Sequence, residues 1–405
     1  MIFIFDPGGI GAVGLKPFIE ASEKYNHILI CSNNSKNGPF ATNFEVVDRL
    51  FKGVFSNFFI NEDLIYTAGF SGGSRLATAI AVLTKQIQGV IACGAGFSPN
   101  TNHQPFLKEK FDYVGLVGEK DMNYQEMLKV RGWLNKLGMN NELFINRDDH
   151  GWPPSKQIAK AFDWLEIQAY KKKIKPQQPN VVASFHQSLY EEARQFEEGN
   201  EMELTLWEYQ RMNRNFGSFF KMDSIQKKIK AIQSTKRYKK EASRGIEIKK
   251  IEDQAKQKYI ERFRLELNAN KSPKNINWWK KELAKLDKDY SNSTNRHFQD
   301  LRYRLIYGIH VMAVEEGNIQ LAKKAYSKAL YCHRIVSILL PERVFPYFLI
   351  AKDYALQNME DETIEYLKMA ISKGLSKKSV ITNDIAFYKY KDSKLFQELL
   401  DEIKE

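Results

Sequence analysis

The chain has 405 residues, which is enough for two or three domains at roughly 150 residues each. Hydrophobic residues make up 43% and aromatic residues 13%, a composition that excludes a disordered or collagen-like chain. No apolar run approaches the roughly 18 residues of a membrane span, so we expect none. The net charge of +12 is concentrated in residues 227–262, where 13 Lys and Arg outnumber 5 Asp and Glu.

Three cysteines, Cys31, Cys93 and Cys332, lie far apart in the sequence, and no CxxC pair is present. Their number and spacing favour buried free thiols over a disulfide framework or a zinc ribbon. No signal peptide precedes the apolar N-terminal stretch. We therefore expect a cytoplasmic protein by default. A targeting segment upstream of this chain is the alternative, and it leaves the localisation open.

Strand-like and helix-like stretches alternate in residues 1–169. The predicted strands are short and rich in Ile, Val, Leu, Phe or Tyr: Met1–Phe5, His27–Cys31, Leu64–Ala68, Gly89–Cys93, Tyr113–Val117 and Glu142–Ile145. The stretches with helical periodicity are 15–25, 43–55, 72–86, 122–137 and 155–170. This alternation predicts an α/β fold, with a mostly parallel sheet covered by helices on both faces.

The organisation changes after residue 170. Residues 171–179 read KKKIKPQQP, a polar stretch with two prolines and no periodicity, which indicates a linker over 171–180. Beyond it the strand signals end, and helical patterns follow. The predicted organisation is an α/β domain at 1–170, the linker at 171–180, a basic long-helix region at 181–290 and an all-α repeat region at 291–405.

Helix pairs are predicted in the last region, with a break between helices at Glu316-Gly317-Asn318. Ala322, Tyr326 and Ala329 are spaced as one helical face, and a second unit carries Ala370 at the position of Ala329. This pattern resembles a degenerate tetratricopeptide repeat, which implies a concave surface for a protein partner. An ordinary helical bundle is the alternative.

The first predicted strand is followed by a glycine-rich loop, in which Gly9, Gly11 and Gly14 fit the pattern G-x-G-x-x-G. After a strand, this pattern is typical of dinucleotide binding, where an acid about 20 residues later binds the ribose. The next predicted strand runs into CSNNSK at 31–36, which has no acid. An NADP site could use Ser, Asn and Lys instead, so a dinucleotide-dependent oxidoreductase stays an alternative.

Residues 69–73 read GFSGG and match G-x-S-x-G, between an apolar strand and a helix rich in small residues. This is the context of a nucleophile elbow, a tight turn that lifts Ser71 above the sheet and requires Gly69 and Gly73. The motif resembles the α/β-hydrolase superfamily, above all its small esterase and depolymerase branch. The resemblance covers residues 1–169, lacks the superfamily's first two strands, and implies a serine hydrolase.

The resemblance also implies an acid and a base that follow the nucleophile in chain order. The superfamily's acid lies just past the second strand after the elbow, and here that position is Asp121. Its base lies between the last strand and the final helix, which points to His150. Asp148 and Asp149 are too close to His150 in sequence to bend onto its ring. We therefore expect a triad of Ser71, Asp121 and His150.

For the oxyanion hole, the resemblance implies two backbone N–H donors. One comes from Gly72, the residue after the nucleophile, and the other from the first loop, at Gly8 or Gly9. Asp6-Pro7-Gly8-Gly9 replaces the His-Gly found in many lipases and esterases. The choice between Gly8 and Gly9 therefore stays open.

The sequence thus predicts a hydrolase that cleaves an ester, or an amide, of a small molecule or polymer through an acyl-enzyme, fused to a helical interaction region. A binding or scaffold protein with an inactive hydrolase fold is the second interpretation. Residues 227–262 contain few aromatic residues and indicate the solvated face of a long helix, so we expect no nucleic-acid partner. The sequence has no cluster of metal ligands, and we expect neither a metal nor a cofactor.

Overall fold

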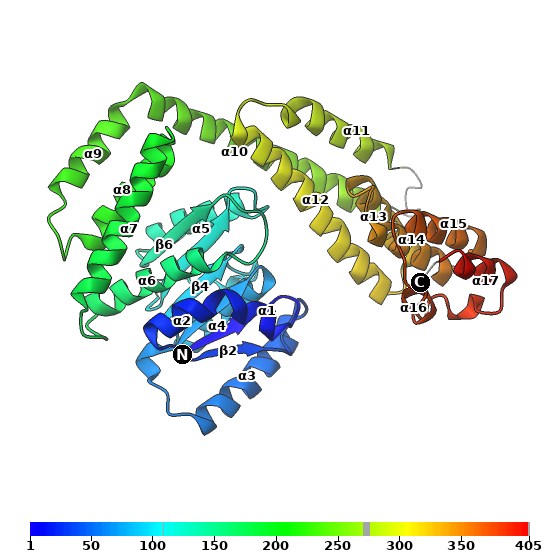
Figure 1. The fold of residues 1–405 in the computed structure, drawn as a ribbon, viewed down its shortest axis with the longest axis horizontal. Helices are drawn as coiled ribbons and strands as arrows, with labels where there is room; N and C mark the ends of the chain where they lie inside the picture. The colour runs from blue at the N-terminus through cyan, green and yellow to red at the C-terminus, as the bar shows by residue number, and fades with distance from the viewer. Residues whose placement is uncertain (108, 270–275, 404–405) are drawn as a thin grey trace. The chain divides into compact units, whose positions relative to one another are not determined.

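The computed structural model describes residues 1–107, 109–269 and 276–403 (Figure 1). The chain divides into two compact units, Met1–Lys249 and Lys250–Glu405. Within the described residues, no helix combines the length and the apolar character needed to cross a membrane.

A parallel sheet forms the centre of the first unit (Figure 1). Its six strands, in the part of the chain that is described, are β1 (Ile2–Phe5), β2 (Leu29–Ser32), β3 (Tyr66–Phe70), β4 (Gly89–Cys93), β5 (Asp112–Gly118) and β6 (Asn141–Asn146). They lie in the order β2-β1-β3-β4-β5-β6, and each neighbouring pair is parallel. Each strand overlaps a stretch predicted as a strand, and the predicted α/β fold class is confirmed.

Helices cover both faces of this sheet. Ile2 and Ile4 of β1 belong to the core on one face, and Phe3 and Phe5 to the core on the other, because successive strand residues point to opposite sides. The first core includes α2 (Ile19–Tyr25) and α6 (Ser155–Lys171), and the second includes α3 (Phe40–Asn57), α4 (Gly72–Thr84) and α5 (Tyr124–Lys136). Burial on both faces explains why β1 is apolar throughout.

Three further helices extend the core on the α6 side: α7 (Pro179–Glu198), α8 (Met202–Phe216) and α9 (Asp223–Ser234). Phe185 of α7 and Tyr209 of α8 belong to the same buried cluster as Phe162 of α6. The segment 171–180 therefore lies inside the first compact unit and runs from the last residue of α6 to the start of α7. Its role as a linker between independently folding domains stays a prediction.

A buried cluster of charges joins α8 to the edge strand β6. Glu142 of β6 accepts hydrogen bonds from Arg214, and its carboxylate lies 3.3 Å from Arg211 Nε. Burial alone would raise the pKa of Glu142, but Arg211, Arg214 and Arg131 lower it to about 2. Loss of one partner would leave a buried charge unpaired, so the cluster fixes α8 to the sheet.

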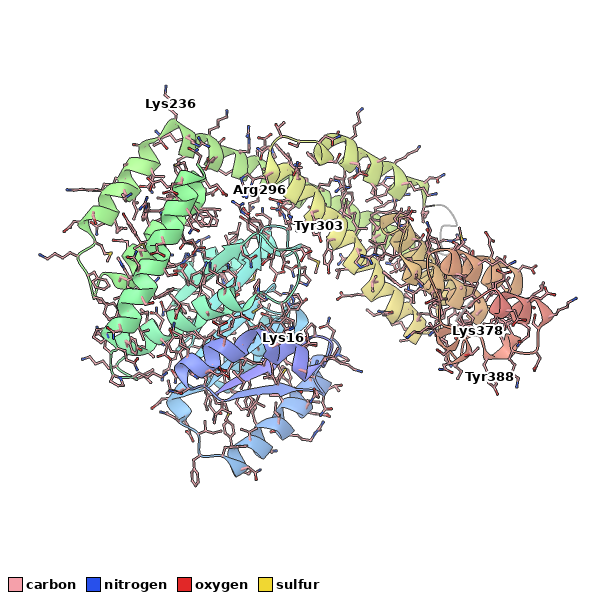
Figure 2. All side chains as sticks on the ribbon, in the orientation of Figure 1. Lys16, Lys236, Arg296, Tyr303, Lys378 and Tyr388 are labelled. Carbon is pink, nitrogen blue, oxygen red and sulfur yellow. The ribbon has the colours of Figure 1, made fainter. Side chains whose placement is uncertain are left out.

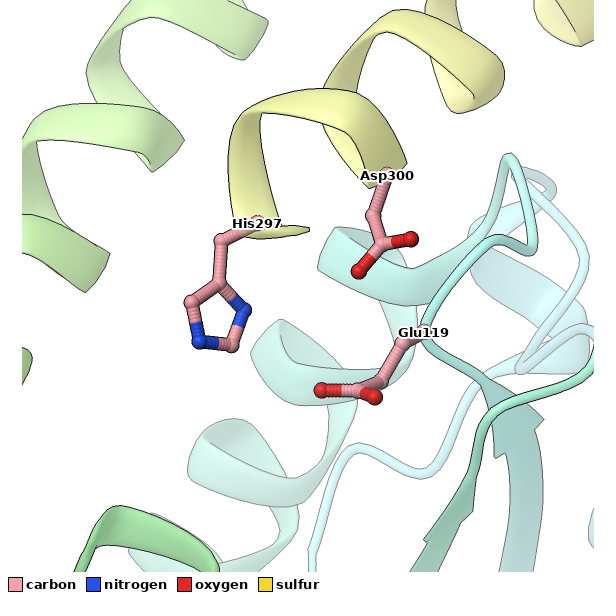
Figure 3. Close-up of side chains that lie close together, drawn as sticks. All are labelled: Glu119, His297 and Asp300. Carbon is pink, nitrogen blue, oxygen red and sulfur yellow. The ribbon is translucent and has the colours of Figure 1, made fainter. Parts of the chain in front are cut away.

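The second unit is helical in its described residues. Its helices are α10 (Lys236–Leu267), which begins in the first unit, α11 (Asn277–Leu286), α12 (Arg296–Ala322), α13 (Tyr326–Leu339), α14 (Val344–Leu356), α15 (Glu360–Ser372), α16 (Lys378–Thr382) and α17 (Lys394–Asp401). Lys236, the first residue of α10, is exposed (Figure 2). His297 and Asp300 lie near the start of α12 (Figure 3). This helical region agrees with the predicted fold class.

A buried hydrogen-bond network joins three helices of this unit. The indole of Trp279 on α11 is fully buried, and its Nε1 donates to Glu266 Oε2 of α10 at 3.0 Å. The same Nε1 lies 3.0 Å from the hydroxyl of Tyr331 on α13, which also contacts Glu266. Buried polar groups that are all partnered specify one packing arrangement.

The predicted helix break at 316–318 is wrong, because α12 continues to Ala322. A Cβ on Gly317 would lie 2.6 Å from His333 Nε2, so the glycine serves the close packing of α12 against α13. The turn comes later, where Lys324 adopts a φ of 58°. Ala322 and Tyr326 consequently lie on different helices, and the tetratricopeptide resemblance stays a prediction.

Candidate active site

Three side chains meet at the edge of the sheet where the parallel strands end. Ser71 follows β3, Asp121 follows β5 and His150 follows β6. His150 Nε2 lies 3.0 Å from Ser71 Oγ, and His150 Nδ1 lies 2.9 Å from Asp121 Oδ1. The side chains of His150 and Asp121 are only 6% and 1% exposed, and the Phe70 ring lies 4.6 Å from the imidazole, measured between centroids. The structure thus brings together the three residues selected from the sequence.

Ser71 lies on a sharp turn between β3 and α4. Its φ of 51° and ψ of −117° are rare for a residue with a side chain, and such a conformation costs on the order of 1–3 kcal/mol. A Cβ on Gly69 would lie 2.2 Å from Gly73 O, and a Cβ on Gly73 would lie 1.9 Å from Phe5 O. The turn therefore requires glycine at both positions, as the sequence motif indicates.

The carboxylate of Asp121 is held by neighbouring backbone. Its Oδ1 accepts a hydrogen bond from Asn123 N–H at 2.8 Å. The side chain of Asn123 in turn donates to Gly94 O, in the loop after β4, at 2.8 Å. Asp121 is therefore positioned by the loops of two adjacent strands.

Two backbone hydrogen bonds tie the loop that carries Asp121 to the loop that carries His150. Glu119, immediately after β5 (Figure 3), donates its N–H to Asn146 O at 2.8 Å. Lys120 donates its N–H to Asp148 O at 3.2 Å. These bonds set the spacing between the carboxylate and the imidazole through the backbone.

Asp6, at the end of β1, is a residue of the site that the sequence analysis did not select. Its Oδ1 accepts hydrogen bonds from Gly8 N–H at 2.9 Å and from Ile10 N–H at 3.1 Å. Its Oδ2 accepts one from Trp152 Nε1 at 2.9 Å. The carboxylate thus links the first loop to the segment that follows His150. The turn signal of Asp6-Pro7-Gly8 was visible in the sequence, but its distant partner was not.

The two candidates for the second oxyanion donor, Gly8 and Gly9, are engaged in folding the first loop. Gly8 N–H donates to Asp6 Oδ1, and Gly9 N–H donates to Asp6 O at 3.1 Å. This use of both amides conflicts with the role of oxyanion donor that the sequence predicted for one of them. Gly72 is the first residue of α4, and amides at a helix N-terminus have no acceptor within the helix. Gly72 therefore stays a candidate donor.

The glycine pattern of the first loop serves close packing against β2 and the loop after it. A Cβ on Gly11 would lie 2.6 Å from Asn33 Oδ1, which accepts Gly11 N–H at 2.8 Å. A Cβ on Gly14 would lie 2.8 Å from Cys31 Sγ. A dinucleotide site would direct N–H groups of this loop at phosphate. Here Gly9 N–H donates to Asp6 O, Gly11 N–H to Asn33 Oδ1 and Gly14 N–H to Ile10 O. Packing therefore explains the G-x-G-x-x-G pattern without a nucleotide.

Cys31, Cys93 and Cys332 are free thiols. Burial raises the pKa of Cys31 to about 11, with a further contribution from the negative charge of Asp6. A thiol with this pKa is protonated at neutral pH and is a poor nucleophile. Although Cys31 lies close to the first loop, its thiol is therefore suited to packing.

No protein-family model and no curated protein sequence matches the chain. Several solved structures are similar to part of it. FphF, a fluorophosphonate-binding serine hydrolase of Staphylococcus aureus, is 14% identical, with a TM-score of 0.33 over 40% of this chain and 82% of that chain. The S-formylglutathione hydrolase FrmB of Staphylococcus aureus is 14% identical, with a TM-score of 0.31 over 40% and 80%. Est1E from Butyrivibrio proteoclasticus is 15% identical, with a TM-score of 0.31 over 42% and 88%.

Proposed function

We propose that the first unit is a serine hydrolase that cleaves carboxylic esters through an acyl-enzyme intermediate. One observation carries the proposal: Ser71, His150 and Asp121 form a continuous chain of contacts of 3.0 and 2.9 Å. Such a chain, from nucleophile to base to orienting carboxylate, is the arrangement that activates a serine hydroxyl. The strained conformation of Ser71 adds support, because backbone strain is concentrated at functional positions.

In the proposed reaction, Ser71 Oγ attacks the acyl carbon while His150 Nε2 takes the hydroxyl proton. Asp121 stabilises the imidazolium that results and keeps its Nδ1 directed away from the serine. When the tetrahedral intermediate collapses, the bond to the leaving alcohol breaks and His150 returns the proton to that oxygen. A water molecule then attacks the acyl-enzyme by the same steps and releases the acid.

A small cavity adjoins the turn that follows the nucleophile, and its size favours a compact substrate. It has a volume of about 70 Å³ and borders Gly72, the residue after Ser71. Its lining includes the polar side chains of Asn37 and Asn43 beside Phe40. We therefore propose short acyl groups rather than long-chain lipids as the substrate.

We also propose that the helices of the second unit bind a protein partner.

A fluorophosphonate probe tests the mechanism, because it labels only a serine that is activated as a nucleophile. We expect labelling of the full-length protein at Ser71, loss of labelling in Ser71→Ala, and unchanged labelling in Ser56→Ala, which alters an exposed serine of α3. Hydrolysis of p-nitrophenyl acetate and longer esters then tests chain length. A folded parent protein that the probe leaves unlabelled would instead support a binding role for an inactive hydrolase fold.

A further inference from the structure

A serine hydrolase needs preorganised donors where the oxyanion develops. Under the proposed function Gly72 N–H is one such donor. The start of the first loop supplies no other in this structure, because Pro7 has no N–H and the four amides of residues 8–11 all donate within the protein. A second donor has to come from a different segment.

Asn37, in the loop between β2 and α3, is placed against Gly72. A Cβ on Gly72 would lie 1.9 Å from Asn37 Oδ1 and 3.4 Å from its Nδ2. The elbow requires glycine at Gly69 and Gly73, where backbone approaches backbone, whereas the three atoms nearest to a Cβ on Gly72 all belong to the Asn37 side chain. Glycine at position 72 therefore has its own explanation, which is that it leaves room for the Asn37 amide beside the nucleophile.

The segment that carries Asn37 is fixed on two sides. Asn37 N–H donates to Pro7 O at 2.8 Å, which ties it to the first loop. The preceding residue, Lys36, donates its N–H to Asn43 Oδ1 at 3.3 Å and accepts from Asn43 Nδ2 at 2.9 Å. These bonds fix the backbone that carries the Asn37 side chain, which limits the reorganisation that an oxyanion donor at this position would need.

We propose that the side-chain amide of Asn37 is the second oxyanion donor, beside Gly72 N–H. Asn37 and Gly72 line the same cavity of about 70 Å³, so the amide borders open space beside the residue that follows the nucleophile. A half-turn of the amide about χ2 exchanges the positions of Oδ1 and Nδ2 and directs an N–H at the oxyanion. The inference rests on the proposed function and adds a residue to it.

The first test replaces Asn37 and follows kcat and KM separately on p-nitrophenyl acetate. Loss of one oxyanion donor lowers kcat on the order of 10²–10³-fold. We expect this loss in Asn37→Ala and in Asn37→Leu, with KM nearly unchanged, because the donor acts in the transition state. Asn34→Ala is the matched control, since Asn34 is an exposed asparagine in the same loop. A kcat of Asn37→Leu within about threefold of the parent value would overturn the proposal.

The second test uses the contact between Asn37 and Gly72. Gly72→Ala keeps the backbone N–H, but its Cβ displaces the Asn37 amide, so we expect a loss of kcat similar to that of Asn37→Ala. In the Asn37→Ala background the same Cβ meets no amide, so the double variant should be no slower than Asn37→Ala. If the two residues contributed only to packing, the double variant would recover thermal stability, and none of the three variants would lose kcat.

Failure of this inference can be told apart from failure of the proposed function. If the parent protein and Asn37→Leu react with the fluorophosphonate at Ser71 at equal rates, the serine is active and Asn37 is not a donor. If the folded parent protein does not react, the proposed function fails and the role of Asn37 fails with it. We expect labelling of both, with the variant at least tenfold slower, because the phosphonate oxygen occupies the oxyanion site during attack.

Discussion

The strained backbone of Ser71 predicts a conflict between stability and activity. Glycine adopts a φ of 51° and a ψ of −117° without a steric penalty, so Ser71→Gly should remove strain on the order of 1–3 kcal/mol. The greater conformational freedom of glycine in the unfolded chain offsets roughly 0.5–1 kcal/mol of this gain in stability. We therefore expect a net gain of about 1 kcal/mol in the free energy of unfolding, with complete loss of turnover.

The matched control is Ser71→Ala, which also removes the hydroxyl but keeps the Cβ and hence the strain. Urea unfolding of the two variants, compared at one pH and protein concentration, isolates the backbone contribution. For a unit of this size, 1 kcal/mol corresponds to a rise in Tm of roughly 2–4 °C. If Ser71→Gly unfolds at the same urea concentration as Ser71→Ala, or at a lower one, then the elbow is not strained and this reasoning is refuted.

Three further outcomes follow from the site and its support. Ser71→Ala, His150→Ala and the double variant should each lose kcat by a similar factor, on the order of 10⁴-fold or more, because the two residues act as one unit. Asp121→Asn should also hydrolyse esters more slowly. If the losses in the two single variants added up in the double variant, the triad would be contradicted. Glu142 has a folded pKa of about 2, below the ordinary 4.5, so its contribution of about 3 kcal/mol is present above pH 4.5 and lost as the pH falls towards 2. The free energy of unfolding, measured with urea between pH 7 and pH 3, should therefore fall less steeply with pH in Glu142→Gln than in the parent protein. Asp6→Asn leaves one acceptor oxygen, so its NH2 group must face either Trp152 Nε1 or the first-loop amides, and it should destabilise the protein by about 1–3 kcal/mol. An unchanged Tm would argue against the link.

The sheet could be predicted from the sequence because most of its strands are buried on both faces. Such strands are short apolar runs, separated by helical stretches and turn residues, and these signals are local. The order of the candidate triad could also be predicted, because chain order and position after a strand are properties of the sequence. That Ser71, Asp121 and His150 lie within contact distance then follows from the parallel sheet, which brings the ends of β3, β5 and β6 to one edge.

The glycines were harder to interpret, because the same residue type is found both in turns and where two segments pack closely. Gly317 suggests a turn when only its neighbours in the sequence are considered. In the structure it lies within α12, where the absence of a side chain lets His333 of the next helix approach. Gly11 and Gly14 suggest a phosphate loop but face Asn33 and Cys31. In each case the neighbour that explains the glycine lies 16 to 22 residues away, between Gly317 and His333 or Gly11 and Asn33, and no local pattern identifies it.

The same dependence on distant contacts explains why the triad could be predicted from the sequence and the oxyanion donors could not. A nucleophile and its base can be assigned from chain order, since each occupies a defined position after a strand. The groups that would hold an oxyanion depend on contacts between loops: Asp6 uses the first-loop amides while it bonds Trp152, and Asn37 reaches Gly72 from the loop after β2. Because Asp6 joins the first loop to the segment after His150, a change in one of these loops alters the other. We therefore expect the donors and the base to be assembled together when the first unit folds, and substitutions at Asp6 to affect both.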